Sequence, residues 1–235
     1  MSNENDREKT ENGGVPEDRN TECTELVFVL DRSGSMHGME RAVIDGFNRL
    51  VEKQRRLPGR ALVSVELFNN RFDTVYDRVD LERVRPLTEW EYRTYGCTAL
   101  LDAVGLAIRH VSRAQGRDWP EARPGNTLFV INTDGYENAS REFSREQIRR
   151  MVEEQEREHG WEFLFLGADI DSYREAGALG IRPEMTCNVV ADVLGMAANF
   201  ASVSEAASSL RSKGFAGSEW RGIVDRDWAA RRGGG

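Results

Sequence analysis

The sequence has little of what would place the chain in an oxidising compartment or a membrane. Its three cysteines, Cys23, Cys97 and Cys187, are widely spaced, and no CxxC pair or Cys/His cluster is present. This pattern excludes a zinc ribbon and a disulfide framework and indicates reduced thiols. No apolar run approaches the roughly 18 residues of a membrane span, and the polar segment Met1 to Asn20 lacks the pattern of a signal peptide. We therefore expect a cytoplasmic protein.

An excess of positive charge is also absent, because the formal net charge is -8. A nucleic-acid groove or an anionic membrane surface needs clustered Lys and Arg, so neither is expected as a partner. The first 22 residues carry seven acids and three bases and have no hydrophobic periodicity. We predict a disordered acidic arm over residues 1–22, one domain over residues 23–211, and a partly flexible extension over residues 212–235.

Apolar runs alternate with amphipathic segments along the domain. The predicted strands cover residues 26–30, 61–68, 72–79, 127–132, 161–166 and 187–190. The predicted helices cover residues 39–55, 99–113, 144–159, 171–179 and 192–211, the third opening on a capping box of Ser144 and Gln147. This alternation predicts an α/β fold with a doubly wound, mainly parallel central sheet and helices on both faces. The tight turn at Asn69-Asn70 makes residues 72–79 the one antiparallel edge strand.

Oxygen-bearing side chains follow the predicted strands at three places. Asp31, Ser33 and Ser35 come directly after the strand 26–30, Thr98 begins a helix, and Asp134 follows the strand 127–132. Ligands of a doubly wound sheet bind beyond the carboxyl ends of its strands, so these side chains are expected to meet. A set of carboxylates and hydroxyls favours a hard cation, which is Mg²⁺, or alternatively Mn²⁺ or Ca²⁺.

The segment Asp31-Arg32-Ser33-Gly34-Ser35-Met36 resembles the DxSxS motif of von Willebrand factor type A domains. Gly96-Cys97-Thr98-Ala99-Leu100 is similar to the threonine loop of that family, and Thr133-Asp134-Gly135 is similar to its later aspartate. The resemblance covers roughly residues 24–211. It implies a Rossmann-like fold with a metal-ion-dependent adhesion site (MIDAS), in a bacterial-type cytosolic single-domain member.

The resemblance also implies a role for each site residue. Ser33 and Ser35 would bind the metal directly, and Thr98 would bind it directly or through water. Asp31 and Asp134 would act largely through water and hold the hydroxyls in place. A protein partner would supply an Asp or Glu as the last ligand. Similar cytosolic proteins belong to bacterial stress-response and conflict systems.

Three functions remain open at this point. A metal held mostly by neutral hydroxyls is under-neutralised and attracts an outside carboxylate, so a metal-dependent protein-binding module is the leading hypothesis. No Ser/His/Asp order, phosphate-binding glycine loop or third carboxylate cluster suggests an enzyme. A metal-dependent phosphohydrolase using Asp31 is the alternative, although position 33 holds Ser where such enzymes usually carry a second Asp. The third is a scaffold whose metal is purely structural. Self-association is also possible, through Glu17, Asp18 or Glu22 of the acidic arm.

The neighbours of the motifs have less specific interpretations. We expect Cys97 to be a small buried side chain, Asp171 to cap the following helix, and Asn138 to make a loop hydrogen bond. Asp169 could also border the site. An aromatic group either lines the rim of a binding face or packs over the edge of the sheet: Trp90, Tyr92 and Tyr95.

Overall fold

The chain folds around a central sheet of six strands in the order β3-β2-β1-β4-β5-β6. A computed structural model describes residues 20–232, so the predicted arm up to residue 19 and the terminal residues 233–235 lie outside the described residues. The strands are β1 (Asn20–Asp31), β2 (Arg60–Phe68), β3 (Phe72–Asp80), β4 (Pro124–Thr133), β5 (Glu162–Ala168) and β6 (Thr186–Val189). All neighbouring strands are parallel except β2 and β3. The predicted fold class and its antiparallel edge strand are confirmed.

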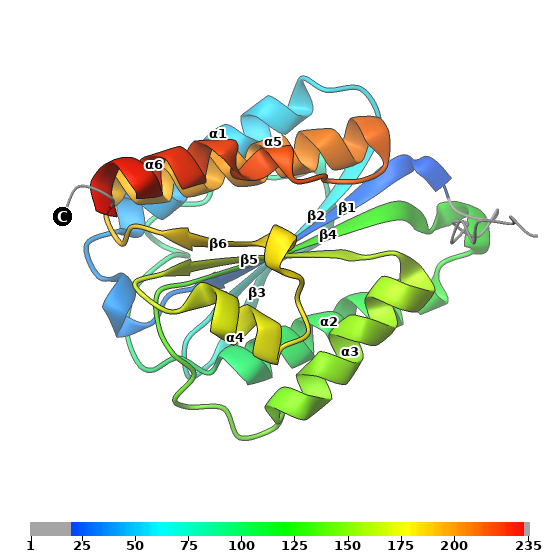
Figure 1. The fold of residues 1–235 in the computed structure, drawn as a ribbon. Coiled ribbons are helices and arrows are strands. Elements are labelled where there is room, and N and C mark those ends of the chain that lie inside the picture. Colours follow the sequence, from blue (N-terminus) through cyan, green and yellow to red (C-terminus); the bar gives the residue numbers. More distant parts are fainter. Residues whose placement is uncertain (1–19, 233–235) are drawn as a thin grey trace, which may run out of the picture.

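Helices cover both faces of this sheet. They are α1 (Glu40–Arg55), α2 (Leu100–Arg117), α3 (Arg145–His159), α4 (Ser172–Ala178), α5 (Val193–Lys213) and α6 (Gly222–Arg232). Figure 1 shows α1, α5 and α6 on one face and α2, α3 and α4 on the other. None of the helices within residues 20–232 combines the length and the apolar character that a membrane crossing needs.

The core forms where uninterrupted apolar strands meet the apolar faces of the helices. Leu26–Leu30 in β1 are at most 1% exposed, which agrees with a strand covered on both sides. Each such side chain stabilises the fold by about 1.5–3 kcal/mol. The apolar face of α1 is buried too, and Phe47 packs edge-on against Phe28 at 5.3 Å between ring centroids. Gly46 allows α5 to approach closely, because a Cβ there would lie 2.5 Å from the Phe200 ring.

Local signals at the ends of the helices also hold. Ser144 and Gln147 form the predicted capping box at the start of α3, and Gly160 ends that helix in a left-handed conformation with φ 60°. The Asp171 side chain accepts a hydrogen bond from the Arg174 N–H, so the predicted cap of α4 is confirmed. These contacts fix where each helix begins and therefore where the preceding loop can lie.

The segment after α5 differs from the weakly structured extension that the sequence suggested. It forms α6, preceded by a 3-10 turn, η5 (Glu219–Arg221), in which Trp220 is 1% exposed. Val224 is fully buried, and its N–H donates to the Ser202 hydroxyl of α5 at 3.1 Å. Phe215, between α5 and η5, remains 55% exposed.

The strand order reverses at β1, and this reversal positions the site. β1 lies between β2 and β4, and the chain leaves β1 toward the face of α1 but leaves β4 toward the face of α3. The two loops therefore diverge at the carboxyl ends of β1 and β4 and leave a crevice where ligands of this architecture bind.

A buried ion pair fastens the edge hairpin to the centre of the sheet. The Glu25 carboxylate in β1 is fully buried and accepts hydrogen bonds from Arg78 Nε at 3.0 Å and Gln115 Nε2 at 2.9 Å. Arg78 also contacts Asp118 at 2.7 Å. Burial raises the pKa of Glu25, and the adjacent Arg78 guanidinium opposes that rise.

We predict that Arg78→Met lowers the free energy of unfolding by about 3 kcal/mol at neutral pH, because a buried carboxylate loses its cation. The double variant Glu25→Gln/Arg78→Met should recover most of this loss, since it leaves no fully buried charge unpaired and Asp118 is partly exposed to solvent. Urea denaturation of the two variants and the parent measures the effect. A double variant no more stable than Arg78→Met would contradict the ion-pair account.

Candidate metal centre at the carboxyl edge of the sheet

The site begins at Asp31, the last residue of β1. Its side chain is fully buried, and both carboxylate oxygens have partners. Oδ1 accepts from the Ser33 N–H at 2.7 Å, and Oδ2 accepts from the Thr133 hydroxyl at 2.6 Å. Asp31 therefore shapes the turn that follows β1 and connects it to the end of β4.

A chain of hydroxyls and one carboxylate lies over this turn. The Ser33 and Ser35 Oγ atoms are 3.0 Å apart, and the Ser35 hydroxyl donates to Asp134 Oδ1 at 2.6 Å. Ser33 is buried, Asp134 is half-buried, and Ser35 is exposed. Residues from two loops 99 positions apart in the sequence thus converge on one spot that solvent can reach at Ser35.

Thr98 reaches the same spot from a third loop. Its side chain is 2% exposed and lies against Gly135, where a Cβ would be 2.7 Å from the Thr98 hydroxyl oxygen. The Gly34 N–H donates to the Gly96 carbonyl at 3.0 Å, which joins the motif after β1 to the threonine loop. Gly96 has φ 81°, and a Cβ there would meet Asn70 Oδ1 at 2.1 Å, so this turn requires glycine. All five residues named from the sequence are brought together.

Two asparagines that lie outside the three motifs hold the threonine loop in place. Asn138 pairs with Thr98 twice: its Oδ1 accepts from the Thr98 N–H at 2.9 Å, and its own N–H donates to the Thr98 carbonyl at 3.0 Å. Asn69, the residue after β2, donates from Nδ2 to the Tyr95 carbonyl at 2.8 Å, and its backbone carbonyl accepts from the Ala99 N–H at 3.0 Å. The predicted loop hydrogen bond of Asn138 is present, and its partner is Thr98 itself.

The aromatic group before the threonine loop divides between the two expected roles. Tyr92 is 1% exposed, and its hydroxyl donates to the Asp31 carbonyl, so this ring packs under the site. Tyr95 is 44% exposed and Trp90 is 77% exposed, so these rings face solvent. Cys97 is exposed as well, and the expectation that it would be buried is wrong. The left-handed turn at Gly96 directs the loop so that Thr98 is buried while Cys97 faces outward.

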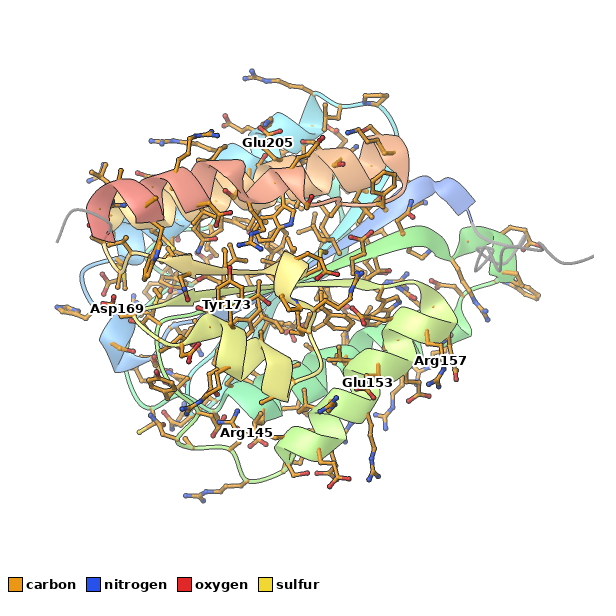
Figure 2. The ribbon with its side chains drawn as sticks, in the orientation of Figure 1. Arg145, Glu153, Arg157, Asp169, Tyr173 and Glu205 are labelled. Atoms are coloured by element: carbon orange, nitrogen blue, oxygen red, sulfur yellow. The ribbon has the colours of Figure 1, made fainter. Side chains whose placement is uncertain are left out.

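Two further side chains border the opposite side of the site. Tyr136, 46% exposed, follows Asp134, and its hydroxyl accepts from the Asp171 N–H at 3.1 Å. Asp169 is exposed at the end of β5 and acts electrostatically on Asp134. Figure 2 shows Asp169 at the outer edge of the molecule, beyond the sheet. The accessible rim therefore combines aromatic rings with an acidic residue.

The site is electrostatically unusual because its carboxylates are withdrawn from water. Burial raises the pKa of Asp31 to about 6, against the hydrogen bonds from Thr133 and Ser33 that lower it, and the Asp134 charge raises it further. Burial also raises the pKa of Asp134, with a contribution in the same direction from Asp169 and an opposing one from the Ser35 hydroxyl. Ionised carboxylates here lack the stabilisation that water or a cation supplies.

Comparisons with known proteins address the fold. No family model matches the sequence, and no curated protein matches it. Among solved structures, the chain is similar to proximal thread matrix protein 1 from the mussel byssus, in a form with a zinc-occupied MIDAS motif, at 16% identity and a TM-score of 0.54 over 79% of this chain and 46% of that one. It is also similar to a von Willebrand factor type A protein from Catenulispora acidiphila, at 14% identity and a TM-score of 0.54 over 79% and 42% of the two chains.

A third similar structure is the manganese-loaded TRAP protein of Plasmodium vivax, at 16% identity and a TM-score of 0.53 over 76% of this chain and 72% of that one. The present chain spans less than half the length of the mussel and Catenulispora chains. Identities this low support a conclusion about architecture alone. The chain has the fold of von Willebrand factor type A domains.

Proposed function

We propose that this chain is a metal-dependent protein-binding module and not an enzyme. Ser33, Ser35 and Thr98 would hold a divalent cation, and Asp31 and Asp134 would orient these hydroxyls and bind through water. The observation that carries the proposal is the continuous contact from the buried Asp31 turn through Ser33 and Ser35 to Asp134. When bound, the cation would supply a positive charge to which a partner's Asp or Glu coordinates.

The chemistry of the donor set fits such an ion. The five side chains offer only oxygen, which suits Mg²⁺, Mn²⁺ or Ca²⁺. Within residues 20–232 no three His, Cys, Asp or Glu side chains gather as a cation site. A cation at this edge would therefore depend on hydroxyls and water, and Mg²⁺ tolerates such mixed ligands. Burial raises the pKa of Asp31. A nearby cation would lower this pKa again, because it would stabilise the ionised carboxylate.

The geometry also leaves room for a partner. Asp31, Ser33 and Thr98 are buried, while Ser35 is exposed, as are Tyr95, three residues before Thr98, and Tyr136, two residues after Asp134. Hydroxyl ligands carry no charge, so the cation would keep its attraction for an external carboxylate. Partly exposed tyrosines are common at protein interfaces, because a ring covers apolar surface while its hydroxyl stays hydrated.

The metal and the biological setting are proposed by analogy. The mussel protein holds zinc in its MIDAS motif and the Plasmodium protein is loaded with manganese. For the present chain Mg²⁺ is the proposed ion, because the donors are hard oxygens. A role in the cytoplasm, within a bacterial stress-response or conflict system, is proposed from the family resemblance.

We expect isothermal titration calorimetry to detect one Mn²⁺ or Mg²⁺ per chain. Ser33→Ala should weaken that affinity at least about tenfold, because it removes a direct ligand. Ser208→Ala is the matched control, since Ser208 lies on α5, where its hydroxyl donates to the Ser204 carbonyl. Equal metal affinity of the two variants would contradict the assignment.

The stability of the metal-free protein should depend on pH through Asp31. Because its pKa rises from 3.8 to about 6 on folding, Asp31 costs nothing when protonated in both states, below about pH 4. The cost grows as pH rises through this interval and reaches about 3 kcal/mol above it. With chelator present, Asp31→Asn should therefore gain stability relative to the parent between pH 4 and pH 7. Parallel pH profiles of the two proteins in urea denaturation would exclude this account.

Partner binding should require both the metal and Asp31. Affinity purification with mass spectrometry, in Mg²⁺ and in chelator, should recover partners that are lost in chelator and lost for Asp31→Ala. The Ser208→Ala protein should recover the same partners as the parent. Recovery that is unaffected by both chelator and Asp31→Ala would refute the proposed function.

A further inference from the structure

A second cationic centre lies between two residues of the candidate metal site, Asp31 and Ser33. Arg32 follows Asp31 directly, and its backbone is fixed on both sides: its N–H donates to the Phe68 carbonyl at 2.7 Å and its carbonyl accepts from the Tyr95 N–H at 2.9 Å. The side chain extends to the edge strand β3, where it pairs with the Asp73 carboxylate. Its guanidinium lies 5.5 Å from the centre of the Tyr95 ring.

Two of the three guanidinium nitrogens of Arg32 have no close hydrogen-bond acceptor. The Arg32 side chain is only 8% exposed, yet its Nε is buried without a hydrogen-bond partner. Nη1 is 3.5 Å from the Glu91 carbonyl, at the limit of a hydrogen bond. A guanidinium carries five N–H donors in a planar fork that matches a carboxylate. Asp73 is thus the one carboxylate paired with this buried cation among the described residues.

A cavity of about 390 Å³ opens beside Arg32. Its wall combines a second arginine, two aromatic side chains and the β3 edge, and the lining residues include Arg32, Asp73, Tyr76, Arg85, Trp90 and Glu91. Arg85 is exposed. The guanidinium of Arg93 stacks on the Trp90 ring, 4.6 Å from its centre. The Glu91 carboxylate is engaged within its own loop by the Thr88 N–H at 3.0 Å and by the Thr88 hydroxyl.

Asp73 occupies the position beside Arg32 that the carboxylate of an external ligand could take. Its side chain is 55% exposed while the arginine that it pairs with is 8% exposed. Transfer of the Asp73 carboxylate into water costs that group little, because it is already largely hydrated, and a carboxylate that takes its place keeps Arg32 paired. An incoming carboxylate that replaced it would gain a charge-assisted contact with a largely desolvated arginine and with Arg85 nearby.

We infer that this cavity is a second carboxylate site, so that the partner is a segment with two acidic residues. One carboxylate would bind the cation of the proposed metal centre and the other would bind Arg32 and Arg85. Because Asp31 and Arg32 are adjacent, the two positions are on the order of 10 Å apart, which an extended chain spans in about three residues. This inference rests on the proposed function and deepens it by naming the chemistry of the partner.

The experiment uses the full chain in Mg²⁺ and a synthetic nine-residue peptide, Gly-Ser-Glu-Ser-Gly-Glu-Ser-Gly-Ser, in which the two glutamates are three residues apart. Two control peptides replace either the first or the second glutamate by glutamine. Affinities are measured by NMR titration, with the side-chain Nε–H signal of Arg32 as a local reporter. We expect the peptide with two acids to bind about tenfold more tightly than either control and to shift the Arg32 signal.

Three variants locate the effect. Arg32→Met and Arg85→Met should reduce the advantage of the second acid to less than about threefold, with circular dichroism confirming that both fold. Arg85 is exposed, so its variant keeps the test valid if Arg32→Met does not fold. Asp73→Asn should increase the advantage, because it removes the internal competitor.

The failures of the two proposals are distinguishable. If a control peptide binds as tightly as the di-acidic peptide, with binding still abolished by chelator, the second site is refuted and the metal-dependent function stands. The same holds if the advantage survives in Arg85→Met. If no peptide shows binding that depends on Mg²⁺ and Asp31, the proposed function fails and the second site fails with it.

Discussion

The burial of one carboxylate, that of Asp31, is the constraint on which the carboxyl edge of this sheet depends. A carboxylate withdrawn from water must have partners, and here they are the Ser33 N–H and the Thr133 hydroxyl. These two contacts fix the turn after β1 and join it to the end of β4. The buried Tyr92 hydroxyl adds a third contact by donating to the Asp31 backbone carbonyl. The positions of the Ser33 and Ser35 hydroxyls follow from this fixed turn.

Hydroxyls in place of further carboxylates give the edge its proposed character. A cation surrounded by carboxylates would be neutralised within the protein, whereas one held by Ser33, Ser35 and Thr98 would keep an attraction for an outside anion. Arg32 is a second positive charge that the protein neutralises only in part. It is a buried cation whose paired carboxylate, Asp73, is itself largely in solvent. Two adjacent residues at the end of β1 would thus direct two positive centres toward one acidic partner.

Much of the architecture could be predicted because the relevant information is local. Parallel strands covered on both faces require continuous apolar runs, and Leu26–Leu30 shows this directly. The cap of α3 is encoded within four residues, Ser144 to Gln147. By contrast, α6 buries Val224 fully but shows no regular apolar face in its sequence. Its formation depends on packing against α5 and β6, which local sequence does not reveal.

The site could be located from its motifs, but its supports could not. Thr133 contacts Asp31 across 102 positions, and Asn138 contacts Thr98 across 40, so neither pairing exists until the sheet has formed. The orientation of Cys97 depends on the left-handed backbone at Gly96 and its contact with Asn70, which local composition does not reveal. That the five residues bind a metal remains a prediction, supported by their convergence and by their oxygen chemistry.

Anomalous X-ray diffraction from crystals soaked in Mn²⁺ tests the central claim most directly, because it locates the ion without reference to activity. The account predicts one strong peak at about 2.0–2.3 Å from the Ser33 and Ser35 hydroxyl oxygens, with Thr98 bound directly or through one water. No peak at saturating Mn²⁺, or a peak elsewhere with these hydroxyls still bonded only to each other and to Asp134, would contradict it.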